Sequence, residues 1–591
     1  MKGHYRWWRY IGPYVSPGKI ETRNVLGLAP RYRWKENPLQ SIWYDSVRQY
    51  TTRLVGIRSV SPGKGELLVV EEVLGLLRAG GLESAYTESG LDPLIGDPFG
   101  RQNGYAFLRG RSLRTIVMLG HIDTVDTADY GPLEPWATDP GGLAARQDAL
   151  VELAPDLAED LASHPGDWMF GRGVIDMKSG VAATIAVMRR LAEMAREGNL
   201  PLSVVLLATP DEENESAGVL QAVHLLLRLR EQYSLEYLGA INTDYTTAHY
   251  PGDVHRYIYT ATIGKLLPSF LVIGREAHVG VPFDGADANL LAAELIRDLS
   301  MNDELCDVVR GQRTAPPVTL HATDLKTHYD VQLPFMAYFY LNVLTLSTGP
   351  DEMLARLRQR AQAVLDRTLQ RIDAAERRWM QTSGDPARVE RLKPRSGIVL
   401  TYADLYAEVG RRLGEKGVDV ELASVWESLP GGLDARERCL HLVRRLWALS
   451  GKQGPAVVIY YAPPYYPHVA AAPCQLHEVV NEVAMAHPEL HLEVQEYYMF
   501  VSDLSYLRLD PRTDLAELTT NIPTWQEPGT TARPGSYSLP LAAIQQLDLP
   551  VVNLGPYGAG VHQRSERALM SYSFGTLPQL LYEVIERLGN P

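Results

Sequence analysis

"VMLGHIDTV", residues 117–125, joins an apolar run to a histidine and a carboxylate. Residues 115–120 are apolar apart from the first and the last, which is typical of a strand buried on both faces of a sheet. His121 and Asp123 follow at once. Because ligands of open α/β sheets gather beyond the carboxyl ends of the strands, the stretch predicts a functional site at that edge.

Short apolar runs alternate with helical patterns from about residue 38 to residue 245. This order of strand, helix and strand predicts an α/β domain with a mostly parallel sheet. We expect strands at 115–120, 203–209 and 237–242, and helices at 181–197 and 218–232.

The pattern then changes to long strands, including 337–346, and a charged amphipathic helix over 351–380. We therefore expect an inserted α+β lid or dimerisation domain within the catalytic domain. The expected parts are 1–255 (catalytic, with an N-terminal arm over 1–37), 256–467 (lid, with an extra helical insertion at about 381–454) and 468–591 (catalytic).

Composition excludes several classes of protein. The chain has 591 residues and a net charge of −14, which argues against a nucleic-acid or anionic-membrane surface. Its three cysteines, Cys306, Cys439 and Cys474, are far apart, so neither a disulfide scaffold nor a thiolate zinc site is expected. The N-terminus lacks the apolar region of a secretory signal, and no apolar run reaches the roughly 18 residues of a membrane span. A cytoplasmic location is the simplest expectation.

Histidines and carboxylates recur where the predicted strands end or a helix begins. Any one of them alone is more typical of a hydrogen-bonded or solvated surface group, but their common position favours one site. Imidazole and carboxylate without thiolate suit two divalent metal ions bridged by a carboxylate, most simply zinc, with cobalt or manganese as alternatives. The set comprises His121, Asp123, Asp176, Asp211, Glu212, Glu213, Asp244 and His562.

Five segments together resemble the M20 metallopeptidase family, which includes carboxypeptidases, aminoacylases and related amidohydrolases. They are "GHIDTV", "GRGVIDMKSG", "TPDEE", "GREAHVGVPFDGADA" and "GPYGAGVHQRSE". The resemblance covers most of the chain except about 1–40 and 381–454. The long insertions and the tail resemble the arginine-utilisation branch of the family called RocB.

The resemblance implies a dinuclear metal centre. It assigns Asp176 as the bridging carboxylate, while Asp123 orients the imidazole of a ligand histidine. The remaining ligands it implies are His121 and Asp244 for the first metal, and Glu213 and His562 for the second.

The resemblance also implies a reaction: hydrolysis of an amide bond in a small molecule or short peptide derived from an amino acid. Glu212 would be the general base toward a water held between the metals. His278, in the lid, would reach the substrate carbonyl, typically across a homodimer interface. The alternative is a catalytically silent relative that binds a metabolite or partner.

Two features depart from the family pattern. The strand at 337–346 carries Asn342 where many relatives have an arginine for the substrate carboxylate, so recognition of a carboxylate by that route is not expected. A turn at Ser502 and Asp503 resembles a pocket-lining turn, but it lies about 45 residues before the last strand. Whether this turn lines the pocket stays open on the sequence.

Overall fold

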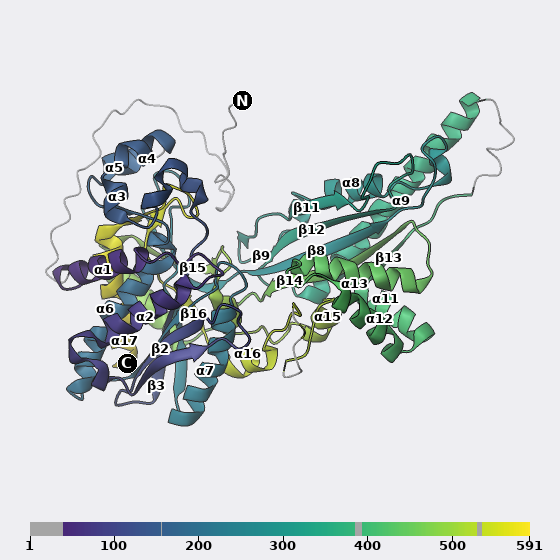
Figure 1. Ribbon diagram of the computed structural model, residues 1–591. Coiled ribbons are helices and arrows are strands. Elements are labelled where there is room, and N and C mark those ends of the chain that lie inside the picture. The colour runs from purple at the N-terminus through teal and green to yellow at the C-terminus, as the bar shows by residue number, and fades with distance from the viewer. Residues whose placement is uncertain (1–39, 155–156, 384–392, 529–532, 534, 591) are drawn as a thin grey trace. The chain divides into compact units, whose positions relative to one another are not determined.

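A computed structural model describes residues 40–154, 157–383, 393–528, 533 and 535–590 (Figure 1). The expected N-terminal arm, residues 1–37, lies outside the described residues. The chain divides into two compact units, and it leaves the first unit and returns to it twice. The first unit is Met1–Thr262, Val469–Leu509 and Pro540–Pro591, and the second is Ile263–His468 and Asp510–Leu539.

The first unit is built on an eight-stranded mixed sheet. Its central strand β3 is parallel to β5 and β6, which are the three strands expected from the sequence. These strands are apolar on both faces because helices cover both. In order across the sheet, the strands are β1 (Glu88–Pro93), β2 (Gln102–Leu108), β5 (Ser203–Thr209), β3 (Arg114–His121), β6 (Glu236–Asn242), β16 (Val551–Asn553), β7 (Arg256–Thr262) and β15 (Leu492–Tyr498).

Helix α6 (Ser179–Arg196) packs on β3 and β5, and α7 (Ala217–Tyr233) packs on β2 and β5. Both match the helices expected at 181–197 and 218–232. A small sheet of β4 (Trp168–Phe170), β18 (Arg567–Leu569) and β17 (Gly558–Ala559) joins distant parts of the chain. The other α-helices of this unit are α1 (Gln40–Val55), α2 (Gly65–Arg78), α3 (Pro140–Ala144), α4 (Gln147–Leu153), α5 (Leu157–Ser163), α14 (Gln475–Ala486), α16 (Leu541–Leu547) and α17 (Leu577–Gly589).

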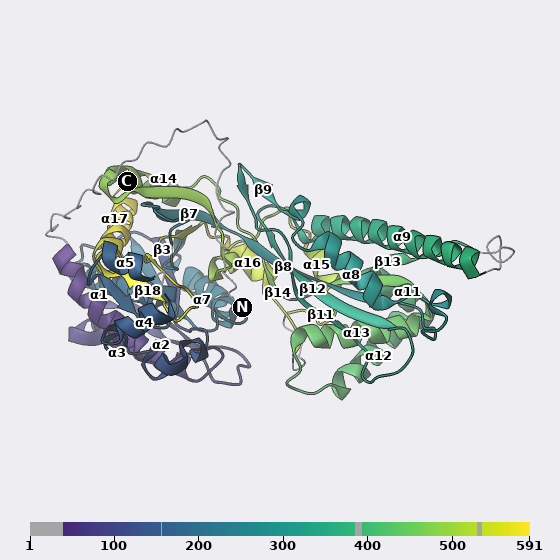
Figure 2. The same ribbon diagram turned by 90° about the horizontal axis from the view of Figure 1, so that it is seen from above.

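The second unit is a five-stranded sheet with helices on both faces. Helices α8 and α9 lie on one side, and α11, α12 and α13 on the other (Figures 1 and 2). In order, its strands are β11 (Val318–Asp324), β12 (Met336–Thr345), β8 (Gly264–Ile273), β14 (Ala456–Tyr466) and β13 (Ile398–Thr401). The helices are α8 (Ala288–Leu299), α9 (Pro350–Ser383), α11 (Tyr402–Leu413), α12 (Glu415–Ser428), α13 (Ala435–Ser450) and α15 (Leu515–Thr520), and β9 (Val308–Val309) pairs with β10 (Gln312–Arg313).

One boundary differs from the expectation. Residues 510–539, expected in the catalytic domain, belong to the second unit. The reason is a set of specific hydrogen bonds from buried Asn521. Its side-chain oxygen accepts the N–H of Ala403 at 3.1 Å, and its carbonyl accepts the N–H of Tyr461 at 2.8 Å. These two bonds attach the segment to helix α11 and strand β14 of the second unit.

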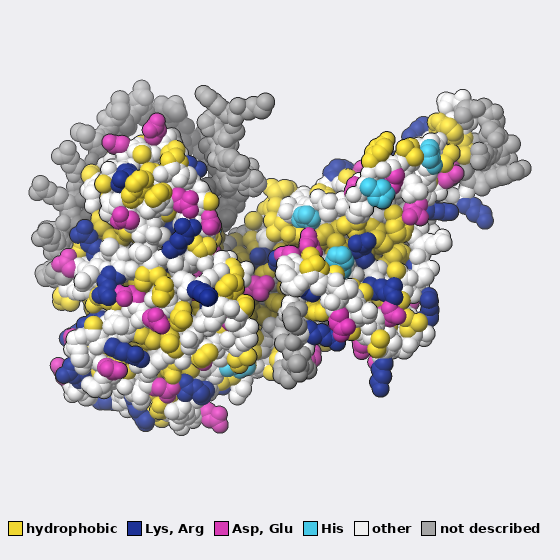
Figure 3. All heavy atoms as spheres, in the orientation of Figure 1, with side chains coloured by type: hydrophobic (Ala, Val, Ile, Leu, Met, Phe, Trp, Pro, Cys, Tyr) yellow, Lys and Arg dark blue, Asp and Glu magenta, His cyan; other side chains and the backbone are white. Residues whose placement is uncertain are grey.

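Two surface properties bear on binding partners. Among the described residues, no helix is long and apolar enough to span a membrane. On the face seen in Figure 3, basic and acidic side chains are interspersed on both units, without a large region of one sign. This distribution lacks the basic patch typical of a nucleic-acid interface.

Candidate metal centre

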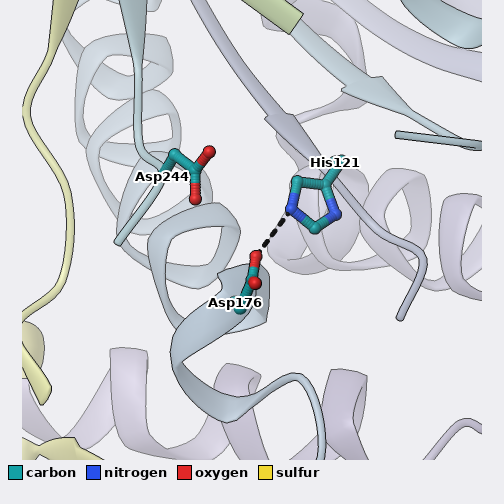
Figure 4. Close-up of side chains that lie close together, drawn as sticks. All are labelled: His121, Asp176 and Asp244. Carbon is teal, nitrogen blue, oxygen red and sulfur yellow. Dashed lines mark hydrogen bonds and ion pairs between the residues drawn. The ribbon is translucent and has the colours of Figure 1, made fainter. Parts of the chain in front are cut away.

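Three side chains from three different segments meet beyond the carboxyl end of β3. They are His121, Asp176 and Asp244, and all three are buried (Figure 4). One ligand atom from each lies within 4.8 Å of the others. His121 Nε2 lies 2.9 Å from Asp176 Oδ1. This group can hold one metal ion.

A second group shares one member with the first. Asp176, Glu213 and His562 also bring one ligand atom each within 4.8 Å of one another. His562 Nε2 lies 3.1 Å from Asp176 Oδ2 and 2.9 Å from Glu213 Oε1. The two oxygens of Asp176 therefore face different histidines, which is the arrangement of a carboxylate that bridges two ions.

The backbone fixes the positions of His121 and Asp244, two members of the first group. His121 is the last residue of β3, and Asp244 lies two residues beyond β6, the neighbouring parallel strand. Asn553, at the end of β16, holds the Asp244 backbone by donating to its carbonyl at 2.9 Å and accepting its N–H at 3.2 Å. Gly555 is required here, because an added Cβ would lie 1.7 Å from the Asp244 carbonyl oxygen.

Asp123 connects the histidine to the two glutamates. His121 Nδ1 lies 3.2 Å from the backbone carbonyl oxygen of Asp123 and 3.5 Å from its Oδ1, which leaves Nε2 directed at Asp176. The same carboxylate accepts the backbone N–H of Glu212 at 3.1 Å and of Glu213 at 3.0 Å. An acceptor on the second nitrogen of a ligand histidine fixes its orientation and tautomer, so Asp123 fits the orienting role.

The electrostatics show an excess of buried negative charge. Burial and the nearby Asp176 carboxylate raise the pKa of Asp244 to about 8. Burial lowers the pKa of His562, but the carboxylates of Asp176 and Glu213 outweigh it and raise the pKa to about 11. Burial also raises the pKa of Glu212 well above its usual range. Divalent cations would neutralise such a cluster, so the donor set fits metal ions.

The other residues expected at the site differ in burial and in hydrogen-bond partners. Glu212 is half-buried and belongs to neither ligand group identified among the described residues. Asp503 is buried and accepts the Thr209 hydroxyl at 3.0 Å, at the end of β5. His278 is exposed in the second unit, where its Nδ1 accepts the N–H of Gly280. Asn342 lies on β12, which has no arginine.

Two buried arginines adjoin the site without having been expected there. Arg172 donates to Glu566 at 2.9 Å, and Glu566 in turn accepts the N–H of Ile175, next to Asp176. Arg101 contacts Glu66 and Asp211. Arg172 and Glu566 fall inside the quoted segments "GRGVIDMKSG" and "GPYGAGVHQRSE", but nothing in the sequence pairs them.

Comparison with known proteins agrees with this geometry. The model of the Peptidase family M20/M25/M40 matches residues 117–512, which is more than half of the chain. This chain belongs to that family. Within the M20/M25/M40 family, it is 31% identical to the uncharacterized protein YqjN of Bacillus subtilis (strain 168) over 553 residues, 92% of this chain and 96% of YqjN. It is 32% identical to the protein RocB of the same organism over 505 residues, 83% of this chain and 86% of RocB.

A solved structure shows the same fold. The aminopeptidase PepT from Bacillus cereus ATCC 10987 superposes with a TM-score of 0.50 and 13% identity, covering 93% of this chain and 99% of PepT. The α/β architecture with a second sheet domain is therefore that of the M20/M25/M40 family. The matched residues 117–512 include four of the five candidate ligands, and His562 lies beyond them.

Proposed function

We propose that this chain is a two-metal hydrolase that cleaves an amide or peptide bond in a small substrate derived from an amino acid. The observation that carries the proposal is the shared Asp176, whose two oxygens face His121 and His562 separately. Membership of the peptidase family supports the reaction class.

The residues fit a pair of divalent ions. His121, Asp176 and Asp244 would hold one, and Asp176, Glu213 and His562 the other. Imidazole and carboxylate ligands favour zinc, with cobalt or manganese as alternatives. When bound, the ions would lower the pKa of a water and stabilise negative charge on the substrate carbonyl oxygen.

Glu212 is the proposed general base. Its backbone N–H is fixed on Asp123, next to that of Glu213, yet its side chain stays outside both ligand groups among the described residues. Successive side chains of an extended or turn segment diverge, so one glutamate can bind metal while the other stays free. The Glu212 carboxylate would accept a proton from the attacking water and pass it to the leaving nitrogen.

The proposal also includes a substrate contact by His278 and a homodimer formed through the second unit. We assign to His278 a hydrogen bond to the substrate carbonyl oxygen, as the family resemblance implies. A homodimer through the second unit is supported by β11, an edge strand of the sheet that carries Leu320 with 53% of its surface exposed. An open edge with apolar side chains is a ready surface for strand pairing.

The absence of an arginine from β12 limits how a substrate carboxylate could be bound. Without an arginine on β12, a substrate carboxylate would need another partner. An arginine-related amide or short peptide is our preferred substrate class, supported by similarity to RocB along 83% of this chain. The mixture of basic and acidic side chains on the face seen in Figure 3 gives no separate support to a cationic substrate.

Elemental analysis combined with an activity screen tests the function. Metal-replete protein should hold about two divalent ions per chain and hydrolyse some members of a panel of N-acyl amino acids and dipeptides. Two bound ions with no hydrolysis across the panel would favour the alternative, a catalytically silent relative that binds a metabolite. Fewer than one bound ion would contradict the proposed centre itself.

A further inference from the structure

The loop that carries Glu212 and Glu213 is held from two sides. On one side, both backbone N–H groups donate to Asp123. On the other side lies Asp211, which is fully buried and adopts a left-handed backbone with φ of 75°. A residue other than glycine rarely takes this conformation, so surrounding contacts must maintain it.

Both the carboxylate and the backbone N–H of Asp211 are hydrogen-bonded. Its carboxylate accepts the Ala217 N–H at 3.1 Å, the Ser61 hydroxyl at 3.2 Å and the Asn214 side-chain amide at 3.2 Å. Its own backbone N–H donates to the Glu66 carboxylate at 2.9 Å. The bonds from Asn214 and Ala217 close the turn that contains the two glutamates.

Arg101 supplies the positive charge of this network. Its Nη1 contacts Asp211 and lies 3.3 Å from Glu66 Oε1, while its Nε and Nη2 donate to Asp97 at 2.9 and 2.7 Å. The guanidinium is 6% exposed, and the Glu66 and Asp211 side chains are 0% and 1% exposed. Without it, the three buried carboxylates of Asp97, Glu66 and Asp211 would lack the counter-charge they share.

We propose that Arg101 is a positioning residue: through Asp211 it sets the backbone turn that directs Glu213 into the second ligand group and keeps Glu212 outside it. This inference rests on the proposed function. Arg101 contacts none of the candidate ligands in the contacts described, so it acts only through the loop. The first ligand group, which draws on other segments, should not depend on it.

Loss of the Arg101 side chain should weaken the binding of only one of the two ions. Removing an outer partner of a ligand typically weakens metal binding about 10–100-fold. We therefore expect Arg101→Met to retain one ion with the wild-type affinity and to weaken the other by about that factor. Asp211→Gly gives a second test, because glycine accepts the left-handed backbone but removes the carboxylate that Arg101 holds.

Titration of the metal-free, full-length protein with Co²⁺, followed by the visible absorption of the bound ion, counts the two binding events. Arg395→Met is the matched control, because Arg395 also pairs with two largely buried carboxylates, Asp373 and Glu376, but in the second unit. It should bind both ions as the wild type does. Circular dichroism verifies folding, and Asp211→Gly decides the question if Arg101→Met does not fold.

The outcomes separate the two proposals. A folded Arg101→Met or Asp211→Gly protein that binds both ions with wild-type affinity, or that loses both together, overturns the positioning role. Wild-type protein that binds no Co²⁺ overturns the proposed function instead. Selective loss of one ion in both variants, with the control unchanged, is the expected result.

Discussion

The carboxylate of Asp123 accepts the backbone N–H of Glu213 at 3.0 Å, although 90 residues separate them in the chain. This bond joins the end of β3 to the loop after β5, and thus the His121 side of the centre to the Glu213 side. The two candidate ion positions are therefore set by one buried carboxylate that binds neither ion in our proposal.

Replacement of Asp123 by asparagine should weaken both ion positions. The amide offers one acceptor oxygen where two backbone N–H groups now donate, and its NH₂ group would face one of them. We expect the dissociation constants for added Co²⁺ to rise by about 10–100-fold. Unchanged binding of both ions by the folded variant would contradict the orienting role of Asp123.

The two adjacent glutamates should give unequal results. Glu213→Gln should lower metal content and activity together, because Glu213 lies in the second ligand group. Glu212→Gln should retain both ions and lower kcat by about 10²–10⁴-fold, the usual contribution of a general base. Steady-state kinetics with metal analysis of the same samples distinguishes these results. A fully active Glu212→Gln enzyme would exclude Glu212 as the base.

The two histidines should control different ions. His562→Ala is expected to leave about one ion per chain, since only the second group contains His562. His121→Ala should remove the other, and each variant should lose most of its activity. Elemental analysis after dialysis at a fixed free metal concentration measures the stoichiometry. Two ions retained by His562→Ala would mean that the second group is not a metal site.

Metal removal should destabilise the folded protein. The carboxylates of Asp176, Glu213 and Asp244 converge within two groups that overlap, and bound divalent cations would offset their negative charge. An ion at 100 times its dissociation constant stabilises by about 2.7 kcal/mol. A chelator should therefore lower the thermal midpoint of the wild type, and by less in Glu213→Gln. Equal midpoints with and without chelator would argue against bound metal.

A histidine remote from the candidate centre should make stability depend on pH. His487 Nε2 lies 2.8 Å from Glu583, which joins the end of α14 to α17. Burial lowers the pKa of His487, but hydrogen bonds to Glu583 and Glu489 outweigh it and raise the pKa above 6.5. Burial raises the pKa of Glu583, but its bonds to His487 and Arg587 outweigh this and lower the pKa below 4.5.

The pair should therefore stabilise the fold most between about pH 4.5 and 6.5, by about 0.5–1 kcal/mol. The contribution should decline as pH rises through the raised pKa of His487, and as pH falls through the lowered pKa of Glu583. Urea denaturation of the wild type and His487→Gln at several pH values measures it. A difference in unfolding free energy that stays constant or grows above pH 7 would contradict the assignment.

The sequence alone predicted the parallel core of the first unit. The apolar runs that became β3, β5 and β6 are buried on both faces, so their composition is uniform and easy to recognise. The order of strands also placed His121, Asp176, Glu213 and Asp244 at one sheet edge, because parallel strands end together. His562, which lies far along the chain, was expected at the same edge, and the family motifs added its role as a ligand of the second metal.

Tertiary structure alone decided the remaining features. Asn521 attaches residues 510–539 to the second unit by accepting two backbone N–H groups, one with its side chain and one with its carbonyl, and such bonds leave no periodic pattern in the sequence. The pairing of Arg101 with Glu66 and Asp211 joins residues that are 35 and 110 positions apart. Charged residues usually face solvent, so composition gives no sign that these are buried. Only folding brings these three side chains together in a buried cluster beside the loop that carries Glu212 and Glu213.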